Sequence, residues 1–400
     1  IVERTPNSSL IPQLCLLLSV LSGVLLGVVT FRYLHHEEAA TQSHIAQALD
    51  QIRDHYVEDI DEDTLAQGAI DGMLGQLDNY SVLLDASQFA QLRQESEGAF
   101  SGVGIEIERR DDTFEIIALI SDSPAFHAGI KTGDRLQAVD DMPTANLDMN
   151  QLISLVKGEP GTAVKLTLLR ENFPQALSIR VVRSHLTVAS ATVRRLEDGV
   201  VHARLTKFQQ RTADELASAL TRLNNDSPVR GLILDLRNNP GGLLSSAIAV
   251  ADLFLQRGVI VTTRKRRGKS AQQHFRATLG DILPGRPIAV LINGGSASAA
   301  EVVAAALRDH RRATLVGARS FGKGSVQTLM PTLGLRQTIK LTTAEYFSPQ
   351  GLAINNVGVD PDVLIEEASA AANTDLWLDA AIAALKHMDL RVEQRLSGTD

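Results

Sequence analysis

Three short segments of the chain carry residue types that can do chemistry together. The first, 293–301, reads NGGSASAAE and lies between a predicted buried strand and a predicted helix. A serine in such a place meets outward-pointing backbone N–H groups and the partial positive charge of a helix N-terminus, and both favour an anion that forms there. The same residues are also ordinary helix caps, so this segment alone does not establish catalysis.

The second segment, 321–327, reads FGKGSVQ and places Lys323 between two glycines, which let the backbone approach a cleft closely. A lysine whose pKa is lowered by burial can act as a general base, and serine with lysine is a recognised nucleophile–base pair. With Gly317 the segment nearly spells a phosphate-binding loop. Gly324, however, stands where that loop needs serine or threonine, and no helix is predicted to follow. A nucleotide site is therefore disfavoured.

The third segment, 238–242, reads NNPGG and directly follows a predicted buried strand. A tight turn of this kind exposes backbone N–H groups that suit an oxyanion hole, although it is also an ordinary strand-to-helix turn. None of the ten histidines lies in a metal-binding or triad motif, and Asp360 with Asp362 is typical of a turn rather than a metal pair. We therefore expect no metal.

The pattern around these segments predicts strands and helices in alternation from residue 187 onward, which indicates a layered α/β core. The buried strands are expected at 229–236 and 288–292, and the helices at 213–223, 243–255 and 299–307. Further strands are expected at 200–205, 313–316 and 335–342, and a last helix at 377–388.

The part of the chain before this core divides into a helical and a β-rich region. Apolar residues at helical spacing predict helices within 44–92. The following module of about 85 residues is predicted to be a compact β-rich domain. Its strands are expected at 100–107, 113–120, 134–139, 163–170 and 177–182, and a short helix at 150–156.

The N-terminal stretch 14–31 reads LCLLLSVLSGVLLGVVTF and has no charged residue. With the apolar residues before it, it approaches the ~20 residues that span a bilayer, so an uncleaved signal anchor is the first interpretation. A cleaved signal peptide is the second, and a buried soluble helix the third. Either of the first two places the rest of a bacterial chain in the periplasm or cell exterior. A net charge of −8 and 4% aromatic residues argue against nucleic-acid binding.

Seven motifs in order resemble those of the carboxyl-terminal processing proteases, serine peptidases of the S41 family that carry a PDZ domain and a Ser–Lys dyad. The resemblance covers residues 42–365 and departs slightly at Ala300 and at the turn 78–80. The motifs are LDNYSVLLD (77–85), GxFxGxG (98–104), SPAFHAGIKTGDRLQAVD (123–140), LILDLRNNPGG (232–242), SASAAE (296–301), FGKGSVQ and GVDPD (358–362).

The resemblance implies an α+β multidomain fold, with a crotonase/Clp protease-like α/β core and an inserted PDZ domain. The implied regions are a membrane anchor or signal segment (1–36), a helical region (37–96), the PDZ domain (97–185), the Ser–Lys protease core (186–366) and a C-terminal helix and tail (367–400). It also assigns the reaction. Ser298 would be the nucleophile, with Ser296 as its rival, Lys323 the general base and Gln327 the residue that orients the lysine. The oxyanion hole would comprise Ala299 and Gly241 or Gly242.

In the PDZ domain, the resemblance assigns substrate binding to the loop Gly102–Val103–Gly104–Ile105. A PDZ domain adds a ligand strand to its sheet edge and holds the terminal carboxylate on backbone N–H groups. Expected partners are therefore protein substrates with free apolar C-termini, together with a regulatory adaptor protein, the membrane and a second copy of the chain, and no cofactor is expected. Two alternatives remain at this stage: a PDZ scaffold with an inert protease core, and a nucleotide-dependent enzyme.

Overall fold

The computed structural model describes residues 44–397, except for 111–112, 121, 172, 267–271, 279, 333–336 and 366–374. The chain divides into two compact units, Ile1–Leu83 and Leu84–Asp400. The apolar segment 14–31 lies outside the described residues. Among the helices that are described, none is long and apolar enough to cross a membrane.

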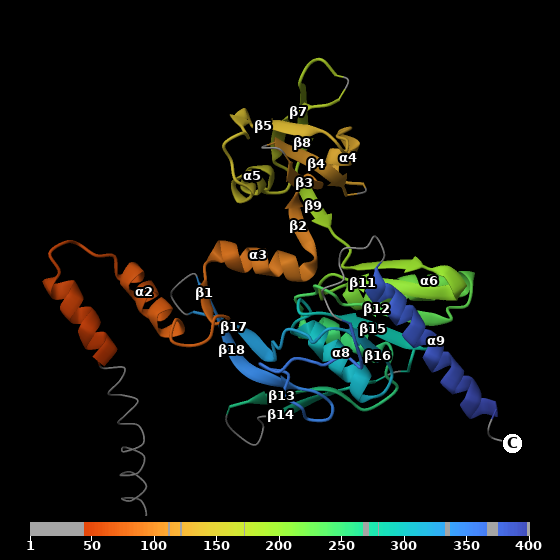
Figure 1. Ribbon diagram of the computed structural model, residues 1–400. Helices are drawn as coiled ribbons and strands as arrows, with labels where there is room; N and C mark the ends of the chain where they lie inside the picture. The colour runs from red at the N-terminus through yellow and green to blue at the C-terminus, as the bar shows by residue number, and fades with distance from the viewer. Residues whose placement is uncertain are drawn as a thin grey trace, which may run out of the picture. The chain divides into compact units, whose positions relative to one another are not determined.

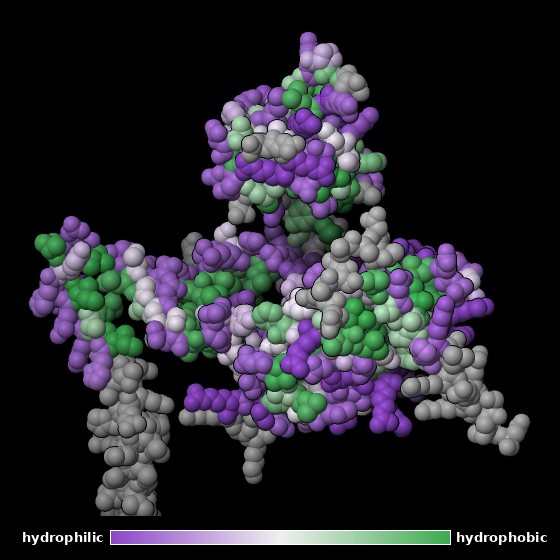
Figure 2. Space-filling model, in the orientation of Figure 1, coloured by the Kyte–Doolittle hydropathy of each residue, from purple (hydrophilic) through white to green (hydrophobic). Residues whose placement is uncertain are grey.

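The described part of the first unit is helical, as its apolar spacing predicted. A helix over 44–55 precedes α2 (Glu62–Leu74), whose N-cap Asp61 accepts a hydrogen bond from the Thr64 amide at 3.1 Å. Apolar side chains on these helices remain exposed, among them Ile45, Ile52 and Met73 (Figure 2). The short strand β1 (Val82–Leu84) lies where the two units meet in the sequence. The second unit then begins with α3 (Ala86–Glu97).

The β-rich module follows α3 and forms its own small core. Its main sheet has the order β3-β4-β5-β7-β8, so β3 has a described neighbour on one side only. The strands are β3 (Ile105–Arg110), β4 (Thr113–Leu119), β5 (Arg135–Val139), β7 (Ala163–Leu169) and β8 (Leu177–Val182), with β6 (Met142–Pro143) beside β5. The helices are α4 (Pro124–His127) and α5 (Met149–Val156).

One strand prediction in this module was wrong. The pattern predicted a single strand over 100–107, but the structure divides it into β2 (Ala99–Gly102) and β3. The two parts pair with different partners, since β2 pairs with β9 (Ser184–Thr187) and β3 with β4. Gly104 makes the break, because its φ of 87° takes the chain out of the extended region.

The α/β core is a six-stranded sheet in the order β10-β11-β12-β15-β16-β19, parallel except for the β10–β11 pair. Its faces are covered by α6, α7 and α8 on one side and by α9 on the other (Figure 1). Alternation along β12 shows this, because Leu232 and Leu234 pack with the first group and Ile233 with α9. Strands buried on both faces read as continuous apolar runs, which confirms the prediction.

The bounds of the core elements agree with most of the predicted ones. The strands are β10 (Ala191–Arg195), β11 (Val200–Leu205), β12 (Gly231–Asp235), β15 (Ile288–Ile292), β16 (Thr314–Gly317) and β19 (Val363–Leu364). The helices are α6 (Thr212–Asp226), α7 (Leu244–Asp252), α8 (Ala299–Asp309) and α9 (Leu376–Ser397), and η1 (Glu197–Gly199) is a short 3-10 turn.

A second, antiparallel sheet packs against the α8 side of the core and contributes Tyr346 to it. It includes β13 (Val259–Lys265), β14 (Gln272–Arg276), β17 (Ser325–Pro331) and β18 (Thr338–Phe347). The β13–β14 hairpin was not predicted, and β18 extends to Phe347 rather than ending at 342. Pairing with both β13 and β17 extends β18 past its apolar stretch.

A buried charge network joins the end of β12 to the start of α9. Asp235 is fully buried and accepts hydrogen bonds from Arg237 at 2.9 and 2.7 Å, with His202 at 3.1 Å. Arg237 also donates to both carboxylate oxygens of Asp375 at 2.8 Å. Burial raises the pKa of Asp235, but the hydrogen bonds from His202 and Arg237 outweigh it and hold that pKa well below 3.8. The network therefore fixes the backbone just before residues 238–242.

Candidate active site

The three segments singled out in the sequence follow three neighbouring parallel strands. Residues 238–242 come after β12, 293–298 after β15 and 318–324 after β16, and these strands are adjacent in the sheet. Because the carboxyl ends of parallel strands meet at one edge, the fold itself brings the segments together.

Ser298 is the N-cap residue of α8 and has an unusual backbone, with φ 56° and ψ −115°. Such a conformation costs a non-glycine residue about 1–3 kcal/mol and is found mainly at functional sites. Its side chain is nearly buried, with 7% of the residue exposed. Ala299, the next residue, is the first of α8, so its backbone N–H belongs to the free amides of the helix start.

Ser296, the rival nucleophile, has a different environment. It is fully buried, and its hydroxyl donates to the carbonyl of Leu236 at 2.8 Å and accepts from the amide of Asn293 at 2.9 Å. Both sides of this hydroxyl are therefore occupied by the backbone. Ser296 fixes the loop between β15 and α8, and its geometry suits a structural residue.

The carboxylate of Glu301 connects the serine segment to the lysine segment. Its Oε2 atom accepts hydrogen bonds from the backbone N–H of Ser298 at 2.7 Å and of Lys323 at 2.8 Å. Its Oε1 atom accepts from the amide of Gly322 at 2.7 Å and from the hydroxyl of Ser320 at 2.6 Å. Glu301 is fully buried, so a single carboxylate oxygen holds the backbones of Ser298 and Lys323 together away from solvent.

Lys323 lies in the loop between β16 and β17 and is partly buried. The glycine after it allows this loop to pack closely, because a Cβ on Gly324 would overlap the backbone of Asn355. The Gly324 carbonyl accepts from the amide of Tyr346 at 2.7 Å, and its N–H donates to the Asn355 side chain at 3.2 Å. On the other side of the lysine, the Gly322 carbonyl accepts from the amide of Asn356 at 2.8 Å, so the loop is fixed on both sides of Lys323.

Gln327 lies on β17, four residues after Lys323. Its side-chain NH₂ donates to the hydroxyls of Ser325 at 2.9 Å and Thr342 at 3.2 Å. These bonds use the amide hydrogens and orient the side chain, and the carbonyl oxygen is the end that suits an ammonium. Gln327 therefore lies in the same loop-and-strand unit as Lys323.

The turn 238–242 packs directly on Ser298. A Cβ on Gly241 would lie 2.8 Å from the Ser298 Cβ and 3.0 Å from the Ala299 nitrogen, so only glycine fits. The Gly241 N–H donates to the Asn239 side chain at 2.9 Å. Asn239 is fully buried and also accepts from the amide of Ala297 at 2.9 Å through its own carbonyl. Among the described hydrogen bonds, the amide of Gly242 has no acceptor, so it and Ala299 are the uncommitted N–H groups at this turn.

Three residues at this site have no role in the sequence-based assignment. Glu301 is part of the SASAAE motif and Asn239 is part of the NNPGG turn, but the sequence assigned a role to neither residue. Tyr346, which is 4% exposed, is on β18. Burial raises its pKa to about 12, and a hydrogen bond with Ser298 acts in the other direction. Its hydroxyl is therefore protonated at neutral pH and lies beside the serine. The contact of Glu301 with Ser298 has a local sequence signal, the S-x-x-E spacing of a capping box. The contacts of Asn239 with Leu205 and of Tyr346 with Ser298 join distant residues and have none.

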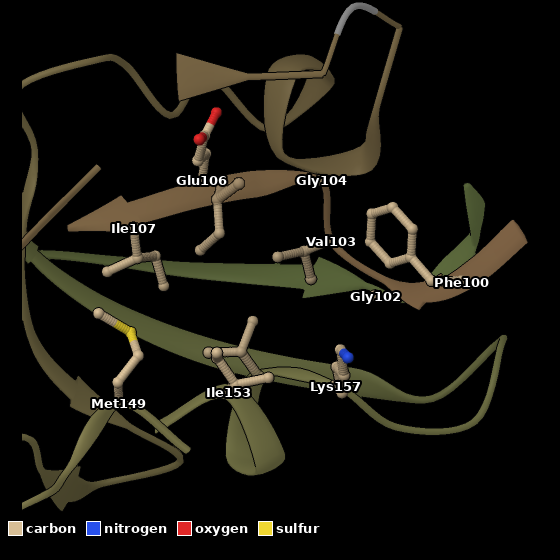
Figure 3. A pocket seen from close by; sticks show the side chains of 11 residues that line it. Phe100, Gly102, Val103, Gly104, Glu106, Ile107, Met149, Ile153 and Lys157 are labelled. Carbon is tan, nitrogen blue, oxygen red and sulfur yellow. The ribbon is translucent and has the colours of Figure 1, made fainter. Parts of the chain in front are cut away.

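The predicted substrate loop of the β-rich module also has a defined geometry. Gly102, Val103, Gly104 and Ile105 all line a groove of about 280 Å³ between β3 and α5 (Figure 3). A sheet edge beside a helix, with a glycine loop at one end, is the arrangement by which PDZ domains take up a peptide strand.

Comparison with known proteins agrees with this geometry. The sequence matches Peptidase family S41 over residues 199–365, the activating protease CtpB N-terminal domain over 30–88 and a PDZ domain over 115–170. A carboxy-terminal-processing protease of Bartonella bacilliformis is 40% identical over 321 residues, which are 80% of this chain and 73% of that protein. The carboxy-terminal processing protease CtpA of Bacillus subtilis is 33% identical over 326 residues, 80% of this chain and 68% of that protein.

Among solved structures, a Bacteroides fragilis protein assigned to the S41 proteases has a TM-score of 0.53 at 16% identity, over 80% of this chain and 90% of that one. At that identity the likeness bears on the fold alone. The relatives, the matched families and the arrangement of the three loops lead to one conclusion. The chain belongs to peptidase family S41, as a serine protease of the carboxy-terminal processing type with a PDZ domain.

Proposed function

We propose that the chain is an endopeptidase in which Ser298 is the nucleophile and Lys323 the general base, acting on proteins recognised by their C-termini. The observation that carries the dyad is the shared Glu301 oxygen, which accepts from the Ser298 amide at 2.7 Å and the Lys323 amide at 2.8 Å. Two backbones held on one buried oxygen place the serine and the lysine on adjoining loops, which supports their pairing as nucleophile and base.

The proton follows a short path in this mechanism. Neutral Lys323 takes the hydroxyl proton of Ser298, and the serine oxygen bonds to the scissile carbonyl carbon. The lysinium then protonates the leaving amine as the C–N bond breaks, which leaves an acyl-enzyme ester. Water hydrolyses the ester with the lysine again as base. Since only the neutral lysine accepts a proton, we expect the rate to fall as the pH is lowered.

The oxyanion is best served by the backbone N–H groups of Ala299 and Gly242. Both belong to the segments that pack on Ser298, and the Gly241 amide is already bonded to Asn239 at 2.9 Å. The dipole of α8 adds partial positive charge at the same place. Of the two glycines assigned from the sequence, we therefore favour Gly242 as the donor. Gln327 would orient Lys323 through its side-chain oxygen.

The test measures how the parent chain and three variants cleave an unfolded protein that ends in apolar residues. We expect Ser298→Ala and Lys323→Ala to abolish cleavage, whereas Lys265→Ala, which changes an exposed lysine on β13, should leave it unchanged. Ser296→Ala should lower stability but keep labelling by a fluorophosphonate reagent, and Ser298→Ala should lose that labelling. Labelling that survives in Ser298→Ala and disappears in Ser296→Ala would reverse the assignment of the nucleophile.

The remaining parts of the proposal concern surroundings and partners. We propose that the core has the crotonase/Clp protease-like architecture, which the parallel sheet with helices on both faces supports. The protein would act in the bacterial periplasm or cell exterior, held to the membrane by the segment 14–31 or secreted. A second copy and a regulatory adaptor are proposed partners. Exposed apolar side chains on the 44–55 helix and α2 support a surface that a partner covers.

A further inference from the structure

The groove beside β3 offers an unpaired strand edge. Among the described strands β3 pairs only with β4, so its other edge is open to the groove. α5 forms the opposite wall (Figure 3). An exposed strand edge presents backbone N–H and C=O groups that bind an added strand. The groove is therefore suited to an extended peptide.

The walls of this groove are mainly aliphatic. Val103, Ile105, Ile107, Ile153 and Val156 line it, together with Phe100 and Met149. A cavity of about 280 Å³ with such a lining accepts one or two aliphatic side chains and offers a polar side chain little compensation for lost water. The lining therefore suits an aliphatic side chain of the bound segment.

The loop at one end of the groove leaves two amides without acceptors. The carbonyls of Val103 and Gly104 accept from Ala125 at 2.9 Å and Ile120 at 3.0 Å, but among the described bonds their N–H groups donate to nothing. Both residues are buried. Unsatisfied buried amides are costly unless a ligand accepts from them, and a carboxylate is the strongest such acceptor.

Lys157 lies at the same end of the groove as Gly102 and Val103, whereas Met149 lies at the other end beside Ile107 (Figure 3). Lys157 is the C-cap residue of α5, and its side chain is exposed. The carboxyl end of α5 is already bound by a buried cation, because Arg183 donates to the carbonyls of Leu155 at 2.9 Å and Val156 at 3.0 Å. Lys157 adds a second positive charge at this end of the groove, and this charge favours a ligand carboxylate there.

The Lys157 ammonium makes no ion pair with any described residue. The charge of Lys157 acts on Glu95, but the pKa of that carboxyl is lowered chiefly by its hydrogen bond to Lys207. Glu95 is bonded to Lys207 at 2.9 Å. The charge of Lys157 therefore remains available to a ligand in the groove.

We infer that Lys157 is the cation that pairs with the terminal carboxylate of a substrate, whose last, aliphatic residue enters the groove between β3 and α5. The inference deepens the proposed function, since it assigns the residue by which that recognition distinguishes a free C-terminus from an internal segment. Recognition that includes this cation can be distinguished by measurement from recognition by backbone amides alone. A cation adds preference for a charged ligand, and this preference is screened by salt.

The test measures peptide binding to the full chain carrying Ser298→Ala, which prevents cleavage. A fluorescent ten-residue peptide ending in valine is compared as the free acid and as the C-terminal amide, by anisotropy at low and high salt. Lys157→Met keeps the length of the side chain but removes the charge. Lys131→Met, which changes another exposed lysine of the same module, is the matched control.

We expect the acid to bind at least tenfold tighter than the amide, and Lys157→Met to reduce that ratio about fivefold at low salt and less at high salt. Lys131→Met should leave the ratio unchanged. An unchanged ratio in Lys157→Met, or a parent that binds neither peptide or both equally, would overturn the inference. Failure of the proposed chemistry is read separately, as absent cleavage of an unfolded protein by the chain with Ser298 intact.

Discussion

Replacing Glu301 by glutamine should separate the two halves of the proposed catalytic site while changing almost no volume. The carboxylate accepts four hydrogen bonds, from the amides of Ser298, Gly322 and Lys323 and from the Ser320 hydroxyl. Glutamine keeps one oxygen, which can serve one pair of donors. Its NH₂ group would face the other pair, so two donors lose their acceptor.

The size of the effect follows from those two lost bonds. A hydrogen bond to a charged group contributes roughly 1.5–3 kcal/mol, and here the donors are left buried. We therefore expect Glu301→Gln to lower the free energy of unfolding of the core by about 3–5 kcal/mol, a large fraction of the 5–15 kcal/mol typical of a domain. Misplacement of the serine relative to the lysine by about 1 Å should lower kcat on the order of 100-fold, with little change in KM.

The assay uses urea unfolding followed by the fluorescence of Trp377, the only tryptophan in the sequence, which lies on α9 and packs against the core sheet. Cleavage is measured on protein shown to be folded under the same conditions. Glu345→Gln is the matched control, because that carboxylate is 49% exposed and lies 3.9 Å from Arg264. It should change stability by less than about 0.5 kcal/mol.

Two results would refute this reasoning. If Glu301→Gln unfolds at the same urea concentration as Glu345→Gln, the four hydrogen bonds contribute nothing to the core. If it is destabilised but its folded fraction cleaves at the parent rate, the carboxylate stabilises the fold without positioning the serine and the lysine.

Three further changes test other parts of the molecule. Arg237→Ala leaves the buried Asp235 charge without its main partner, so chemical denaturation should show a loss of about 3–5 kcal/mol. Because the pKa of Asp235 is lowered on folding, its stabilisation is present above about pH 4 and is lost below it, and parent stability should fall on acidification. Gly104→Ala should abolish peptide binding in the anisotropy assay, because the added Cβ would overlap the Cβ of Ser123 and lie 2.7 Å from the Ser123 hydroxyl oxygen. Gly129→Ala is the control and should keep binding, because Gly129 has a similar φ of 77° but open space around it. Tyr346→Phe removes the hydroxyl beside the proposed nucleophile and should lower kcat about tenfold without changing KM; an unchanged kcat would exclude a role for that hydroxyl.

The sequence predicted the buried parallel strands well because they have a simple signal. β12 and β15 are continuous apolar runs, and such runs occur where both faces of a strand are covered. The β13–β14 hairpin has no such signal, since β14 reads QQHFR and lies at an edge of its sheet. Its pairing depends on contacts with distant residues, which no local window contains.

The candidate site divides in the same way. Ser298, Lys323 and the glycines stand in local motifs, and the fold places their segments on neighbouring strands. The residues that hold these segments together do so across the chain: Glu301 bonds a residue 22 positions away, and Asn239 bonds Leu205 at 2.9 Å, 34 positions away. Composition and spacing contain no information on such pairs, so these contacts required the structure.

The backbone of Ser298 connects these observations. A serine with φ 56° is strained, and strain of this kind persists only where the surroundings determine the backbone more strongly than the residue's own preference. Here the Ser298 amide is held by Glu301, and the preceding amide, of Ala297, by the carbonyl of Asn239 at 2.9 Å. The Gly241 backbone packs so closely on Ser298 that the serine has no room to move toward the turn 238–242. Asn239 and Gly241 both lie in the turn after β12, and Glu301 lies on α8 and also holds the lysine loop after β16, so movement of either loop should release the serine. Catalytic geometry and core stability are therefore expected to fail together in variants of these three residues.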